Sequence, residues 1–209
     1  RSRISKKALK GIQTLISVGA PIETRVAPRK SRRIYITDTE INHLAHKLAH
    51  PTEIIIPTHF DTQLAKPLMR KRAIFHKIDG LHGHVHLHPH IRPKTVSNPP
   101  KVMVRRLLGD GIHDSDEILQ IPENWLEGLS IFTADENEVT GNPWNLIQNV
   151  ANMDGVITQS VTLASEAVLL GVPTLLISKA KRGFLDRLKS DGYPLFVAKE
   201  KDESILAQW

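Results

Sequence analysis

Short apolar runs alternate with amphipathic stretches along almost the whole chain. Residues 52–57, TEIIIP, form a wholly apolar run of the kind that is buried in a parallel sheet. Residues 40–50 place apolar side chains at 41, 44, 45, 48 and 49, which is the spacing of an amphipathic helix that ends before Pro51. This alternation of strand and helix predicts an α/β fold built on parallel sheets.

The remaining elements follow the same alternation. We expect further strands at 11–20, 32–40, 101–107, 129–136, 154–160, 172–178 and 193–199. We expect further helices at 21–27, 143–153, 161–171 and 180–192, and Pro21 suits the first turn of the earliest of them.

One proline-rich stretch divides the chain. Residues 91–100, IRPKTVSNPP, hold three prolines and show no apolar periodicity, which is typical of a linker. We therefore predict a first domain at 1–92, a linker at 93–100 and a second domain at 101–209. Because the chain opens inside an α/β unit, with no strand to start it, we expect the first domain to be incomplete.

Composition narrows the classes of protein that fit. The 209 residues are 40% hydrophobic, enough for one large or two small cores. There is no cysteine, so disulfides and thiolate metal sites are excluded. No apolar run is long enough for a membrane span, and the basic N-terminal stretch lacks the apolar core of a signal peptide. We expect a cytoplasmic protein without a membrane span.

The charge balance is basic. The formal net charge is +6, which suits either anionic partners or general surface solvation. Only 5% of residues are aromatic and none interleaves with the basic clusters APRKSRR and MRKR, so a stacking platform for single-stranded nucleic acid is unsupported. Nucleic acid is therefore not an expected partner, and the sequence does not predict an oligomeric state.

The segment 153–178, MDGVITQSVTLASEAVLLGVPTLLIS, carries the most specific pattern. An apolar strand runs into small polar residues and then directly into a helix, with Ser160 or Thr162 as its N-cap. The start of such a helix can bind phosphate. Glu166 lies one turn further on the same face, where a carboxylate can accept hydrogen bonds from ribose. An ordinary β-α-β turn with a capping serine and a solvated glutamate fits the same spacing.

This segment resembles the nucleotide-binding signature of GT-B glycosyltransferases and of UDP-N-acetylglucosamine 2-epimerase. The chain as a whole is similar to a largely archaeal family of glycosyltransferase-like proteins, domain of unknown function 354. The matching stretches occur in order as ITDTE, LHPHIRP, VMVRRL with IHD, and TLASEAVLLGVPTL. The resemblance implies two Rossmann-like domains, the first of them incomplete, in a GT-B-like arrangement.

The resemblance also implies a function. It points to a glycosyltransferase that takes a nucleotide-sugar donor, UDP-type, and an unidentified acceptor, with no cofactor and no metal. Ser160, Val161 and Thr162 would hold the diphosphate, and Glu166 would bind the ribose. Gln159 and Ser160 stand where the family carries glycines, which alters the approach to phosphate. A UDP-sugar 2-epimerase and a non-catalytic basic binding module are the alternatives.

Further candidates lie at other strand ends. Arg105, at the end of a predicted strand, could pair with phosphate as a planar fork. His113 and Asp114 follow in a loop, where a histidine beside a carboxylate can act as a general acid or base; a solvated loop is the alternative. Asp38 and Glu40 could activate an acceptor hydroxyl, but DTE equally suits a helix start, with Asp38 or Thr39 as cap.

Five histidines occur at alternate positions in GLHGHVHLHPHIRP, at 82, 84, 86, 88 and 90. On a strand they would share one face at a spacing of about 7 Å, too wide for neighbours to share one zinc ion easily. The resemblance covers only LHP, so His88 alone is expected at the interdomain cleft. We expect no dedicated metal site here.

Overall fold

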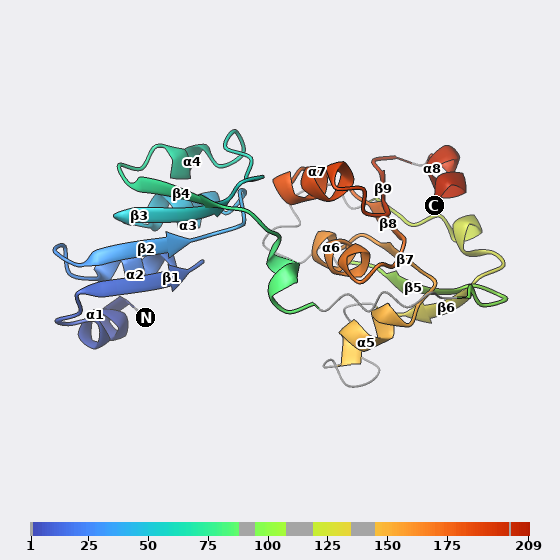
Figure 1. Cartoon of the computed structure of the whole chain (residues 1–209), viewed down its shortest axis with the longest axis horizontal. Coiled ribbons are helices and arrows are strands. Elements are labelled where there is room, and N and C mark those ends of the chain that lie inside the picture. Colours follow the sequence, from blue (N-terminus) through green and yellow to red (C-terminus); the bar gives the residue numbers. More distant parts are fainter. Residues whose placement is uncertain (1, 88–94, 108–118, 135–144, 201) are drawn as a thin grey trace. The chain divides into compact units, whose positions relative to one another are not determined.

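A computed structural model describes residues 2–87, 95–107, 119–134, 145–200 and 202–209 (Figure 1). The chain forms two compact units. The first comprises Arg1–His82 with Arg182–Phe184, and the second comprises Gly83–Lys181 with Leu185–Trp209. The predicted linker at 93–100 is only partly covered by the described residues.

The first unit is built on a four-stranded parallel sheet in the order β1-β2-β3-β4. Its strands are β1 Thr14–Val18, β2 Arg32–Ile36, β3 Glu53–Pro57 and β4 Ile74–Ile78. Its helices are α1 Ser2–Ala8, α2 Pro21–Val26, α3 His43–Leu48 and α4 Lys66–Met69.

Apolar side chains on one face of this sheet form the core with the helices. Tyr35, Ile54 and Ile56 are buried there against Leu68 of α4. The opposite face is much more open, since Ile16 and Val18 of β1 are 64% and 74% exposed. Among the described residues this sheet therefore departs from the usual parallel sheet, which is covered on both faces.

The second unit is built on a five-stranded parallel sheet in the order β6-β5-β7-β8-β9. Its strands are β5 Lys101–Arg105, β6 Ser130–Thr133, β7 Gly155–Thr158, β8 Thr174–Ile177 and β9 Leu195–Ala198. The α-helices are α5 Leu146–Ala151, α6 Val161–Leu169, α7 Gly183–Ser190, whose first two residues belong to the first unit, and α8 Glu203–Gln208. Two 3-10 helices, η1 His82–Val85 and η2 Glu123–Leu126, complete the described elements, with His82 of η1 in the first unit.

The core of the second unit is closely packed. Every residue of β7 and β8 is buried, as expected of central parallel strands. A Cβ atom on Gly155 would lie 2.5 Å from the ring of Trp209, so a larger residue there requires the ring to move.

The predicted α/β class with two parallel sheets is confirmed. Two local expectations are wrong. The helix expected from residue 40 begins at His43, because the side chain of Asn42 caps it by accepting from the amide of Ala45. The first three histidines of the row do not lie on a strand, since residues 82–85 form a 3-10 helix.

Candidate functional site

The strand order of the second sheet changes direction between β5 and β7. The chain runs from β5 to β6 on one side and returns to β7 on the other side of β5. In open α/β sheets, ligands bind outside the carboxyl ends of the strands at such a reversal. Here those ends are Arg105 and Thr158, which are partners in the register of the two strands.

Three hydrogen bonds hold the turn that leaves β7, and one of them reaches back to β5. The hydroxyl of Thr158 donates to the carbonyl of Arg105 at 3.3 Å and accepts from the amide of Ser160 at 2.9 Å. The hydroxyl of Ser160 accepts from the amide of Leu163 at 3.3 Å. Ser160 is therefore the N-cap of α6, which confirms one of the two caps expected from the sequence.

The first turn of α6 presents backbone donors at this edge. The amides of Val161 and Thr162 precede the first residue that can bond within the helix, so they have no intrahelical acceptor. Thr162 is exposed and Val161 is partly exposed. Together with the positive end of the helix dipole, these amides can hold an oxyanion.

Gln159 lies between the strand and the helix, and its side chain is buried. Its Oε1 accepts from the amide of Leu107 at 2.7 Å, and its Nε2 donates to the carbonyl of Leu119. The amide of Gln159 also donates to the carbonyl of Arg105. The local sequence pattern marks Gln159 only as a departure from glycine, because a side chain that joins two distant backbone segments leaves no signal in local spacing.

Glu166 lies one turn into α6, and the histidine-rich segment reaches it. Nε2 of His86 is 3.4 Å from Oε1 of Glu166, and their side chains are 42% and 21% exposed. Nε2 of His84 lies 3.4 Å from the hydroxyl of Tyr193. Gly83 permits this approach, because a Cβ atom there would lie 2.3 Å from Leu169 of α6.

Arg105 and Arg106, beside this turn, differ in their exposure and in their contacts. Arg105 is the last residue of β5 and is partly buried. Arg106 forms an exposed ion pair with Glu123, with Nη2 at 3.4 Å from Oε1. Surface ion pairs of this type contribute little to stability.

The candidates of the first unit do not form one cluster. Asp38 is exposed, accepts from the hydroxyl of Thr39 at 3.2 Å, and lies 3.7 Å from Nδ1 of His82. Glu40 is fully buried and its Oε1 accepts from the amides of Asp61 at 3.2 Å and Gly183 at 3.0 Å. Neither Asp38 nor Thr39 caps α3, so that alternative is wrong.

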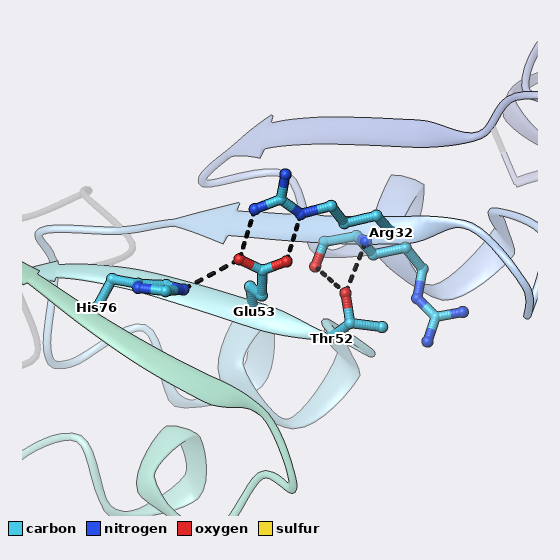
Figure 2. Close-up of polar contacts among 5 residues, drawn as sticks. Arg32, Thr52, Glu53 and His76 are labelled. Atoms are coloured by element: carbon cyan, nitrogen blue, oxygen red, sulfur yellow. Dashed lines mark hydrogen bonds and ion pairs between the residues drawn. The ribbon is translucent and has the colours of Figure 1, made fainter.

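A charged group in the first unit lies away from the carboxyl ends of its strands. Glu53, the first residue of β3, binds the guanidinium of Arg32 through both oxygens and Nε2 of His76 at 3.0 Å (Figure 2). The Arg32 hydrogen bonds, aided by His76 and by the charge of Arg32, lower the pKa of Glu53 to about 2 against the cost of burial. This group joins three neighbouring strands and is a cross-strand contact.

Three predicted residues, His88, His113 and Asp114, lie outside the described residues. Within the described ranges, no three His, Asp or Glu side chains gather as metal ligands, and no helix is long and apolar enough to cross a bilayer.

No family model matches this chain, and neither the curated proteins nor the solved structures include a significant match. The resemblance to GT-B glycosyltransferases therefore stays a prediction from the sequence. The geometry described above is the basis on which a function can be argued.

Proposed function

We propose that the second unit binds the diphosphate of a nucleotide-sugar at the carboxyl ends of β5 and β7. The observation that carries the proposal is the reversal of strand order at this point, with a capped helix starting directly beside it. The amides of Val161 and Thr162 would bind phosphate oxygens, and Arg105 would add a positive charge. Glu166 would bind the ribose hydroxyls.

The proposed reaction is glycosyl transfer. The oxygen of an acceptor hydroxyl would form a bond to the anomeric carbon while the bond from that carbon to the diphosphate breaks, and the hydroxyl proton would pass to solvent or to the leaving diphosphate. The negative charge that builds up on the leaving diphosphate would be stabilised by the helix amides and Arg105. Epimerisation of a UDP-sugar would use the same binding groups, and analysis of the sugar product distinguishes the two reactions.

A thermal-shift titration tests the binding step. UDP, UDP-N-acetylglucosamine, GDP and ADP are titrated in the presence of a chelator against the wild type, Glu166→Ala and Glu127→Ala. Ligand at 100 times its Kd stabilises the folded state by about 2.7 kcal/mol, so the melting temperature rises. Glu127 is the matched control, because it is exposed and makes no hydrogen bond through its side chain within the described structure.

We expect a nucleotide-selective rise in the wild type and in Glu127→Ala, and a much smaller rise in Glu166→Ala. If none of the four ligands raises the melting temperature of the wild type, the proposed function is wrong.

A further inference from the structure

The segment between α3 and β3 is hydrogen-bonded to several other elements of the first unit. Nζ of Lys71, which follows α4, donates to the carbonyls of Lys47 and Ala49 at 2.8 Å each. These are carbonyls at the end of α3, so Lys71 holds this helix end. The amide of His50 donates to the hydroxyl of Thr24 in α2 at 3.1 Å. Parts of α2, α3 and the turn after α4 are thereby fixed around His50.

The start of β2 joins the same segment. The amide of Arg33 donates to the hydroxyl of Thr52 at 2.8 Å, and the amide of Thr52 donates to the carbonyl of Arg33 at 2.9 Å. Three cationic side chains come from the elements joined here, and the charge of each acts on the imidazole of His50: Lys71, Arg25 and Arg33.

Carboxylates do not balance these charges within the described residues. Within the described residues none of the four side chains forms an ion pair with a carboxylate. Nη1 of Arg33 donates to the carbonyls of Pro28 and Arg29, while its Nε is buried without an acceptor in that part of the chain. Burial, together with Lys71, Arg25 and Arg33, lowers the pKa of His50.

The whole unit shares this excess of positive charge. Residues 1–82 contain 16 Lys and Arg against 6 Asp and Glu, a formal net charge of +10, although the complete chain carries only +6. Residues 83–209 are therefore net acidic. A charge asymmetry of this size between two parts of one chain indicates that the basic part has an anionic ligand.

We propose that Arg25, Arg33, His50 and Lys71 form a binding site for a phosphate group. An arginine fork matches two phosphate oxygens, and protonated His50 can donate to a third. The ammonium of Lys71 has three donors and uses two for carbonyls, so one remains for the ligand. This site belongs to the first unit and does not depend on the proposed nucleotide site.

The imidazole of His50 reports directly on the ligand. The pKa of His50 is measured by NMR titration of the full chain in inorganic phosphate and in sodium chloride of equal ionic strength. A bound phosphate places negative charge beside the imidazole, so we expect the pKa of His50 to rise by about one pH unit in phosphate. The same titration is repeated in Lys77→Gln, which removes a charge from β4, and the same rise is expected there.

Two variants locate the site. Arg25→Gln removes one cation from an exposed position that makes no side-chain bond in the described structure, and Lys77→Gln removes one charge from β4. We expect the Kd for phosphate to rise about tenfold in Arg25→Gln, the effect of losing one charge-assisted hydrogen bond, and to change less than twofold in Lys77→Gln.

A parallel titration with glycerol 3-phosphate distinguishes the source of the phosphate group. Binding of both compounds assigns the site to phosphate esters, and binding of inorganic phosphate alone assigns it to the free ion. An unchanged pKa of His50 in both compounds overturns the proposal. So does an equal loss of affinity in the two variants.

Discussion

Oε1 of Gln159 accepts a hydrogen bond from the amide of Leu107, 52 positions earlier in the chain, at 2.7 Å. The same carboxamide donates to the carbonyl of Leu119. One buried side chain therefore fixes the backbone after β5 at two points beside the start of α6.

Replacing this carboxamide has a large expected cost. Gln159→Leu leaves a buried amide and a buried carbonyl without partners, so we expect a loss of about 2–5 kcal/mol in the free energy of unfolding. Urea unfolding followed by circular dichroism measures it. Gln148→Leu, at an exposed position of α5, is the matched control and should change stability by less than about 0.5 kcal/mol. Equal effects in the two variants would contradict the role of Gln159.

A second prediction concerns the packing of the C-terminal residue. Gly155→Ala adds a methyl group 2.5 Å from the ring of Trp209, so the ring must move. We expect a loss of about 1–3 kcal/mol and a red shift of the tryptophan emission as Trp209 becomes hydrated. The chain has three tryptophans, so Trp209→Phe in both backgrounds identifies the emission of this ring. An emission spectrum unchanged by Gly155→Ala would show that the ring does not cover Gly155.

Glu53 provides a test at acid pH. Its pKa is lowered to about 2, first by the hydrogen bonds from Arg32, so its ionised form stabilises the folded state above the unfolded value of 4.5. That contribution is lost as the pH falls from 4.5 through about 2. NMR titration of the carboxyl carbon should give a midpoint near 2 in the wild type and a higher midpoint in Arg32→Gln. Arg29→Gln is the control and should leave the midpoint where it is.

His46 affects the stability of the fold near neutral pH rather than at acid pH. It is fully buried, its Nε2 bonds to the carbonyl of Thr39 at 2.9 Å, and burial lowers its pKa. Below about pH 6.5 the unfolded chain takes up a proton that folded His46 does not, so stability should fall as the pH drops from 6.5.

Unfolding midpoints measured between pH 7.5 and 5 check this dependence. His46→Gln should flatten it, with a remainder from His50, whose pKa is also lowered. The exposed variant Lys10→Gln should leave the slope as in the wild type, and a slope unaffected by His46→Gln would contradict the prediction.

A ribose contact predicts a specific discrimination. If Glu166 binds the ribose diol, UDP should bind about tenfold more tightly than 2′-deoxyuridine diphosphate, because a missing hydroxyl leaves the carboxylate unpaired. Isothermal titration of both ligands measures this ratio. The ratio should approach one in Glu166→Ala and stay near tenfold in Glu127→Ala. Tight binding of both ligands with no discrimination in the wild type would remove Glu166 from the site.

Local patterns in the sequence predicted most of the architecture. The apolar runs of β3, β7 and β8 and the serine before α6 are local signals, and the structure follows them. The start of α3 was missed because DTE and Asn42 are both good caps, and only the bond from Ala45 to Asn42 decides between them. The sequence pattern does not distinguish such neighbouring caps.

Other features depend on contacts between residues that are far apart in the chain. Alternating histidines favour a strand, but residues 82–85 instead form a 3-10 helix in which Gly83 packs on Leu169. The burial of Glu40 depends on an amide 21 positions away. Local spacing in the sequence does not encode contacts between distant residues. The contact of His86 with Glu166 and the two hydrogen bonds of the Gln159 side chain could therefore not be predicted from the sequence.

The open face of the first sheet affects how separate molecules interact in solution. Ile16 and Val18 lie exposed at one edge of that sheet, and Ile74 and Ile78 at the other. Two such faces attract each other through apolar surface, while the positive net charge of the chain keeps molecules apart. Salt screens the repulsion and leaves the apolar attraction in place. The second virial coefficient of this protein should therefore decrease, and its tendency to self-associate should increase, as ionic strength rises.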